Sequence, residues 1–156
     1  SGQQNEAGFA MDNDQTPRSP GEMSPDTAPP VIANPHYQRI GGETAIRHLV
    51  DRFYVLMNEL PKARIIRALH ADDLALAKER LFMFLSGWLG GPPLYAERFG
   101  PPRLGQRHQA FPIGVAERDA WMLCMTRALD EVVTDVALRT QLTQSFFKTA
   151  DFLRNR

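Results

Sequence analysis

Apolar residues recur every three or four positions along most of the chain after residue 36, which is the spacing of one face of an α-helix. Gly41 and Gly42 precede the first apolar stripe and Pro61 follows it, so we expect a helix between these points. A short helix over residues 62–68 should come next. The first stripe consists of Ile46, Leu49, Val50, Phe53, Tyr54 and Met57.

A second long helix is predicted from about residue 74 to about residue 89. The turn before it contains Asp72 and Asp73, whose carboxylates can cap the helix and stabilise its positive end. Glycines and prolines at positions 90–93 end this helix, and residues 94–111 indicate short turns and helical pieces. The shared apolar face comprises Leu74, Ala77, Leu81, Phe84, Leu85 and Trp88.

Two further helices complete the pattern, one beginning near Gly114 and one occupying the end of the chain. We find no run that indicates a strand and no internal repeat. The sequence therefore predicts an all-α domain with four principal helices joined by irregular segments. The apolar positions of the last two helices are Ala120, Trp121, Cys124, Ala128 and Leu129, then Val136, Leu142, Phe146, Ala150 and Leu153.

Residues 1–35 have a different character, because six of the twelve prolines lie there among Ser, Asp, Asn, Gln and Gly. Such a segment buries too little apolar area to offset the entropy of ordering it. We therefore expect a flexible N-terminal extension and a globular domain over residues 36–156. Met11 is a candidate natural start, with residues 1–10 a remnant of recombinant expression. A linker is the simpler interpretation of the extension, and a partner-binding arm is the alternative.

The composition fits one soluble globular domain. Of the 156 residues, 43% are hydrophobic and 23% charged, and 18 basic residues balance 18 acidic ones. No global field therefore favours nucleic acid or an anionic membrane as a partner. The single cysteine excludes an intrachain disulfide, and the sequence has neither an apolar run long enough to span a bilayer nor a secretory signal. We expect a cytoplasmic protein that is a monomer or a weak homodimer.

Several familiar chemistries leave no trace in the sequence. There is no Gly-rich phosphate loop, no cysteine pair for zinc or an iron–sulfur cluster, and no Gly-x-Ser-x-Gly elbow. Asp72 and Asp73 are adjacent, so their side chains suit a helix cap better than a shared metal site. Cys124 lies on an apolar helical face and is interpreted as a core residue rather than a nucleophile.

Four histidines remain, and a surface or hydrogen-bonded role is the plain interpretation of each. His36 lies at the boundary of the extension, and His48 stands beside the charged Arg47. His70 and His108 have more distinctive surroundings. A basic residue precedes His108 and apolar residues follow it. Because imidazole can ligate haem iron, a cation can pair with a propionate and apolar side chains can cover a porphyrin, His108 is a candidate haem ligand.

At these residues the sequence resembles a group II truncated hemoglobin, over about 120 residues from Tyr37 to the C-terminus. Each motif is weak alone, and their common order and spacing carry the resemblance. One departure is Gly105, which stands where the family commonly has a basic residue; this puts a propionate contact there in doubt. The motifs are residues 37–42 with 52–54, residues 69–74, residues 82–92 with 94–95, residues 103–108 with 111–114, and residues 116–121.

The resemblance implies a shortened globin fold, a two-over-two helical sandwich around haem b. It implies that His108 is the proximal iron ligand. On the distal side, it implies that Tyr54 donates its hydroxyl to the bound ligand, that Trp121 lies along the haem with its N–H in reach, and that His70 lies beside the pocket. Ala77 matches the position where other globins carry a distal histidine, and its small side chain leaves a route into the pocket open.

The same resemblance assigns further residues to the surroundings of the haem. Leu81 is expected to pack over the distal face. Arg80, Tyr95 and Arg107 are candidate partners of the propionates, and a solvated charge is the alternative for the arginines. The expected haem walls are Phe84, Trp88, Phe111, Ile113 and Met125, for which ordinary core packing is the alternative.

Donors fixed in a dry pocket stabilise a negatively polarised oxygen ligand, so we expect slow oxygen release, which argues against bulk delivery. Three functions stay open. The first is redox chemistry with an external reductase, such as nitric oxide dioxygenation or peroxide detoxification. The second is reversible sensing or scavenging of oxygen, carbon monoxide, nitric oxide or sulfide, and the third is a helical interaction protein without a cofactor. Protonation of His70 is expected to tune reactivity near neutral pH.

Overall fold

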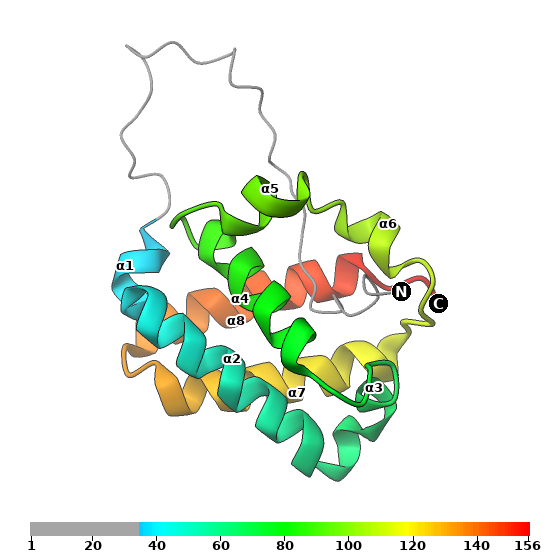
Figure 1. The fold of residues 1–156 in the computed structure, drawn as a ribbon. Helices are drawn as coiled ribbons and strands as arrows, with labels where there is room; N and C mark the ends of the chain where they lie inside the picture. The colour runs from blue at the N-terminus through cyan, green and yellow to red at the C-terminus, as the bar shows by residue number, and fades with distance from the viewer. Residues whose placement is uncertain (1–34) are drawn as a thin grey trace.

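The computed structural model describes residues 35–156, which form an all-α fold built on four principal helices (Figure 1). Within these residues there is no β-strand, as the sequence predicted. Residues 1–34 of the expected extension lie outside the described residues. The four principal helices are α2 (Gly42–Glu59), α4 (Ala75–Trp88), α7 (Val115–Val132) and α8 (Val136–Phe152).

Shorter helices connect the principal ones. The single helix predicted over residues 62–68 is two pieces, because Pro61 opens a tighter 3-10 turn before the α-helical turn begins. Residues 94–111 contain two short helices, in agreement with the expected mosaic of helical pieces. The connecting elements are α1 (His36–Ile40), η4 (Pro61–Ala63), α3 (Arg64–Arg67), α5 (Leu94–Phe99) and α6 (Leu104–His108).

The principal helices pack as two pairs. Helix α2 packs against α4, α7 packs against α8, and α2 also lies across α7, so that one pair rests on the other (Figure 1). This is the two-over-two arrangement that the resemblance implied. Fully buried side chains fill the core, among them Phe53 and Met57 of α2, Leu129 of α7, and Leu142 and Phe146 of α8.

The turn after α4 is fixed by close contact with α1. Gly90 has a φ of 98°, which side-chain-bearing residues rarely adopt. A Cβ atom at Gly91 would collide with the ring of Tyr37, whose backbone N–H donates to the carbonyl of Leu89 at 2.8 Å. The glycine pair therefore lets the end of α4 and the start of the domain approach closely.

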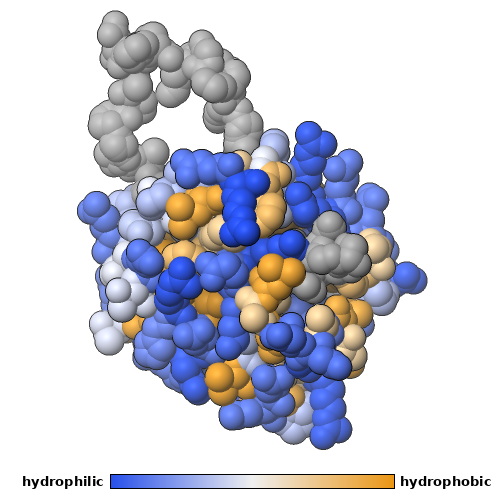
Figure 2. All heavy atoms as spheres, in the orientation of Figure 1, coloured by the Kyte–Doolittle hydropathy of each residue, from blue (hydrophilic) through white to orange (hydrophobic). Residues whose placement is uncertain are grey.

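The surface is mostly hydrophilic, with small apolar clusters between polar side chains on the face shown in Figure 2. In the part of the chain that the structure describes, none of the helices combines the length and the apolar character that crossing a bilayer requires. Among residues 35–156, the large apolar residues that are exposed are Ile65, Leu76, Val115, Val136, Phe147 and Phe152.

Candidate functional site

A cavity lies where α3 and the turn after it meet the first half of α7, the segment between α6 and α7, and the end of α8. Five of the residues predicted for the haem site line it: His70, His108, Phe111, Ile113 and Trp121. Six further residues that the sequence analysis did not assign complete the lining: Ile66, Leu69, Glu117, Arg118, Ala150 and Leu153.

His108 is the last residue of α6 and is only 3% exposed. Its Nδ1 lies 2.8 Å from the carbonyl oxygen of Leu104. Because a carbonyl can only accept, Nδ1 carries the proton and donates, and the lone pair of the neutral ring resides on Nε2. An imidazole with this tautomer and orientation is what an axial iron ligand needs, so the donor chemistry at this position fits haem.

His70 follows α3 and is 9% exposed. Its Nδ1 donates to the carbonyl of Ile66 at 2.8 Å, and its buried Nε2 has no hydrogen-bond partner among the described residues. Burial lowers the pKa of His70 below its ordinary value of 6.5, and the nearby Arg67 acts in the same direction. In the neutral ring Nε2 is therefore an acceptor, and it becomes a donor only when the ring is protonated.

Tyr54 and Trp121 approach the same region from α2 and α7. The ring of Tyr54 is fully buried and meets His70 edge to face at a centroid distance of 5.8 Å. Phe53 contacts Tyr54 at 4.9 Å and Trp121 at 5.1 Å. Trp121 lines the cavity itself, whereas Tyr54 contacts His70 but is absent from the lining. The three predicted distal residues thus gather at one end of α2 and α7.

Phe111 lines the cavity, but the other two aromatic residues predicted as haem walls, Phe84 and Trp88, belong to a row of rings outside the lining. Phe84 contacts Trp88 at 6.4 Å and Tyr95 at 6.3 Å between ring centroids. Trp88 stacks on Phe146 at 4.6 Å, and Phe146 contacts Trp121 at 5.7 Å. Phe146 therefore joins the predicted wall to the cavity, although its sequence position showed only a helical core stripe.

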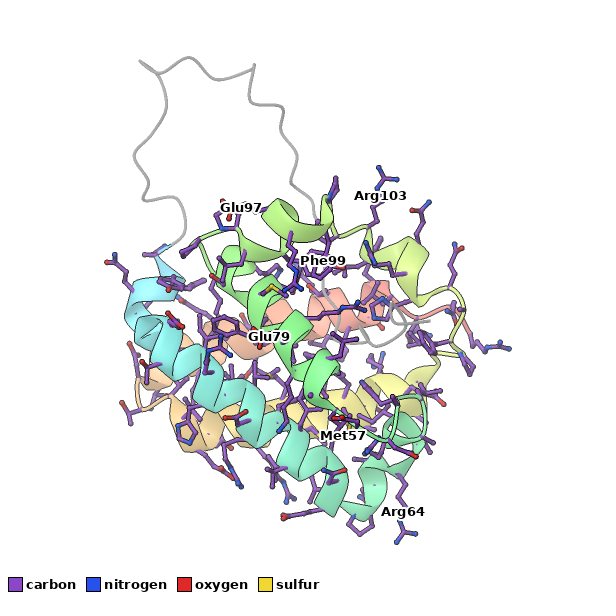
Figure 3. All side chains as sticks on the ribbon, viewed as in Figure 1. Met57, Arg64, Glu79, Glu97, Phe99 and Arg103 are labelled. Carbon is purple, nitrogen blue, oxygen red and sulfur yellow. The ribbon has the colours of Figure 1, made fainter. Side chains whose placement is uncertain are left out.

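The predicted propionate partners also lie outside the cavity lining. The guanidinium of Arg107 lies 5.5 Å from the ring centroid of Tyr95, and its Nε donates to the carbonyl of Pro102 at 2.7 Å. Arg80 lies over Phe99, which Figure 3 labels on the part of α5 that faces α4. Leu81 and Met125 are buried in the core, where they too do not line this cavity.

The arginine that does line the cavity is Arg118, at the beginning of α7. It donates to Asp151 of α8 at 2.7 Å, pairs with Asp119 at 3.0 Å and lies over the ring of Phe147. The carboxylate of Asp151 holds the pKa of this guanidinium above its ordinary value. The sequence analysis missed Arg118 although it lies in one of the matched motifs, because the contact depends on how α7 and α8 meet.

The other polar candidates behave as ordinary residues. Cys124 is completely buried, and burial raises the pKa of its thiol to about 11, which confirms its interpretation as a core residue. His48 is exposed on α2, as expected. Within residues 35–156, no three His, Cys, Asp or Glu side chains gather to hold a metal ion.

Comparison with known proteins identifies the family. The model of the family described as "Bacterial-like globin" matches residues 35–155. A group 2 truncated hemoglobin, YjbI of Bacillus subtilis, is 36% identical over 79% of this chain and 90% of that protein. The group II 2-on-2 hemoglobin of Agrobacterium tumefaciens superposes with a TM-score of 0.76 and 40% identity over 82% of this chain and 98% of that one.

A cold-adapted truncated hemoglobin of Pseudoalteromonas haloplanktis also has a TM-score of 0.76, with 38% identity over 79% of this chain and 98% of that one. With the fold and the buried histidine at the end of α6, these similarities define the class. The chain belongs to the bacterial-like globin family and, within it, to the group II truncated hemoglobins. Membership of a globin family implies that the protein binds haem and, at the haem, small ligands such as oxygen.

Proposed function

We propose that the chain holds haem b through His108, binds oxygen and other diatomic ligands with slow release, and uses the bound ligand in redox chemistry. The observation that carries this proposal is the pair of buried histidines lining one cavity, each with Nδ1 committed to a carbonyl. His108 would then hold iron through the lone pair of Nε2, and His70 contributes a second imidazole to the same cavity.

The chain supplies the surroundings of the group as well as its ligand. Phe111 and Ile113, next to His108, line the cavity with apolar surface and would exclude water from one face. Phe84, Trp88 and Leu81 of α4 are the proposed walls of the opposite side, and Met125 of α7 is proposed to close the inner end. Arg80, Tyr95 and Arg107 remain the proposed partners of the two propionates.

When bound, the haem supplies an iron coordination position and electrons for ligand chemistry. The residues of the chain set how long the ligand stays. Tyr54 O–H and Trp121 N–H are buried donors beside His70, and donors in a dry site favour a ligand that carries negative charge. A neutral His70 adds an acceptor there rather than a third donor. We therefore expect affinity to be set mainly by a slow off-rate.

The specific reaction that we propose is the conversion of nitric oxide and bound oxygen to nitrate, for which ferrous haem would supply one electron and be left ferric, with peroxide reduction as a second redox activity. Slow oxygen release favours this reaction over delivery. Turnover requires an external reductase, which agrees with the cytoplasmic location we expect. The alternative is a non-enzymatic sensor or scavenger that binds oxygen, carbon monoxide, nitric oxide or sulfide reversibly.

One experiment separates these functions. The purified chain is reconstituted with one equivalent of haem, reduced to the ferrous state, loaded with oxygen and mixed rapidly with one equivalent of nitric oxide, and nitrate is measured. Stoichiometric nitrate supports the redox function, and recycling with a reductase makes it catalytic. Oxygen displaced intact, without nitrate, supports the sensor. A protein that takes up no haem would contradict both.

A further inference from the structure

The helix that carries His108 has little local structure and few packing contacts to hold it in place. Helix α6 has only five residues and no side-chain cap, and it begins after Arg103, whose φ of 46° is unfavourable for a residue with a side chain. The side chain of Arg103 points away from the fold (Figure 3). Among the described residues, α6 packs extensively on no other helix. Gly105 adds no side-chain contact, because a Cβ there would meet open space.

Residues near the C-terminus provide hydrogen bonds that hold the end of α6 and the segment after it. The side-chain Nδ2 of Asn155 donates to the carbonyls of His108 at 3.3 Å and Phe111 at 2.9 Å. Its Oδ1 accepts from the backbone N–H of Ile113 at 2.9 Å. The backbone N–H groups of Asn155 and Arg156 both donate to the carbonyl of Ile113, at 2.8 and 3.2 Å. The end of the chain therefore lies against the segment after α6, where Figure 1 places the C label.

These bonds involve one continuous segment, residues 108–113, which contains His108 and two apolar residues of the cavity wall. The carbonyl of His108 also accepts from the N–H of Phe111 at 3.0 Å, so Asn155 reinforces the turn by which the chain leaves α6. The side-chain amide is the right group for this place, because one side donates to two carbonyls while the other accepts from an N–H.

The residues just before Asn155 are bonded to the pair of helices α7 and α8. Asp151, near the end of α8, accepts from Arg118 of α7 at 2.7 Å and from Arg154 at 2.9 Å. Ala150 and Leu153 of the same region line the cavity. Asn155 lies three residues after the end of α8. It thus links α6, the short helix that carries His108, to the α7–α8 pair.

We propose that Asn155 is a positioning residue for His108: it fixes the depth and orientation of the proximal imidazole by holding the backbone carbonyl of that residue. This inference rests on the proposed role of His108 as the haem ligand. Asn155 touches neither the haem nor its ligand in this account, and it acts only through the backbone of residues 108–113.

The test compares variants of the full chain, each loaded with haem. Asn155→Ala removes all three side-chain bonds and is expected to raise the rate of haem transfer to excess apomyoglobin about tenfold. It should also shift or broaden the iron–histidine stretching band in the resonance Raman spectrum of the ferrous protein. Asn155→Asp keeps an acceptor for Ile113 but turns an oxygen toward two carbonyls, so it should lose haem at least as fast as Asn155→Ala.

Gln144→Ala is the matched control, since it truncates another amide side chain, one that is exposed on α8. It should retain the haem-transfer rate and the iron–histidine band of the parent. If Asn155→Ala also retains both, or if it lowers only the melting temperature, the positioning role is overturned. A parent chain that binds no haem would instead refute the proposed function, so the two failures can be told apart.

Discussion

At the scale of single residues, the site is built from two histidines that use the same local bond. His70 donates from Nδ1 to the carbonyl of Ile66, and His108 donates from Nδ1 to that of Leu104, in both cases four residues back. Each ring is thereby fixed in one tautomer with its Nε2 lone pair away from the backbone. What differs is the neighbourhood: His70 meets the ring of Tyr54, and His108 ends a short helix beside Phe111.

The first prediction concerns the hydroxyl of Tyr54. If it donates to the ligand, Tyr54→Phe should release oxygen about fivefold faster or more, because one neutral hydrogen bond contributes about 1 kcal/mol. Oxygen dissociation measured by stopped-flow displacement with carbon monoxide provides the rate.

Tyr37→Phe is the matched control, since Tyr37 lies on α1 against the turn after α4 and outside the cavity lining. Its oxygen release should stay within a factor of about two of the parent. An off-rate for Tyr54→Phe no greater than that of the control would remove Tyr54 from the distal role.

The second prediction concerns the charge of His70. Burial lowers its pKa below the ordinary 6.5, so the unfolded chain binds a proton more readily than the folded one as the pH falls. The contribution of His70 to stability is therefore complete above pH 6.5 and decreases as the pH falls through the folded-state pKa. His70→Phe should unfold in urea with a smaller loss of free energy between about pH 7 and about pH 5 than the parent.

Because its pKa is lowered, His70 is expected to change the rate of ligand release only at acidic pH. The sequence suggested tuning near neutral pH, whereas the folded environment keeps the ring neutral there. Oxygen release should thus be flat around neutrality and change only below about pH 6.5. A step in the off-rate centred above pH 7 that disappears in His70→Phe would contradict this assignment.

At the scale of helices, one carboxylate shows how the ends of elements are fixed. Asp135 accepts from the N–H of Leu138 at 3.1 Å and so caps α8, and it pairs with Arg39 of α1 at 3.1 Å. The backbone bond and then the arginine lower the pKa of Asp135 below its usual value. The ion pair is exposed to solvent whereas the capping bond is partly buried, so the cap should contribute more than the ion pair.

We therefore expect Asp135→Ala to lower the free energy of unfolding by about 1 kcal/mol. Asp135→Asn retains a capping oxygen while losing the charge. It should lower the free energy of unfolding by about half of that amount or less. Urea unfolding followed by circular dichroism at neutral pH measures both. Equal losses in the two variants would show that the pair with Arg39, rather than the cap, carries the effect.

The principal helices could be predicted from the sequence, and the short ones could not be placed. Helices α2, α4, α7 and α8 each carry a long apolar stripe, so their period was readable, and breakers marked the bounds of α2 and α4 and the start of α7. Helices α5 and α6 have six and five residues. Elements of that length are marginal alone and depend on tertiary contacts, such as those of Asn155, that no local pattern reveals.

At the scale of the whole molecule, the two helix pairs bring distant segments into one site. The cavity combines residues from α3, α7, the end of α8 and the segment after α6. Motif resemblance located His108, His70 and Trp121, because they lie in matched stretches. It gave no sign that Phe146 would contact Trp121 or that Arg118 would line the cavity, since both depend on how α8 packs.

The measurement that tests the central claim most directly is the optical spectrum of His108→Ala beside that of His48→Ala, a variant of an exposed histidine on α2. We predict that His108→Ala retains little haem and lacks the ferrous five-coordinate histidine spectrum, and that added imidazole restores it. His48→Ala should match the parent in haem content and spectrum. A His108→Ala protein with the haem content and ferrous spectrum of the parent would contradict the account.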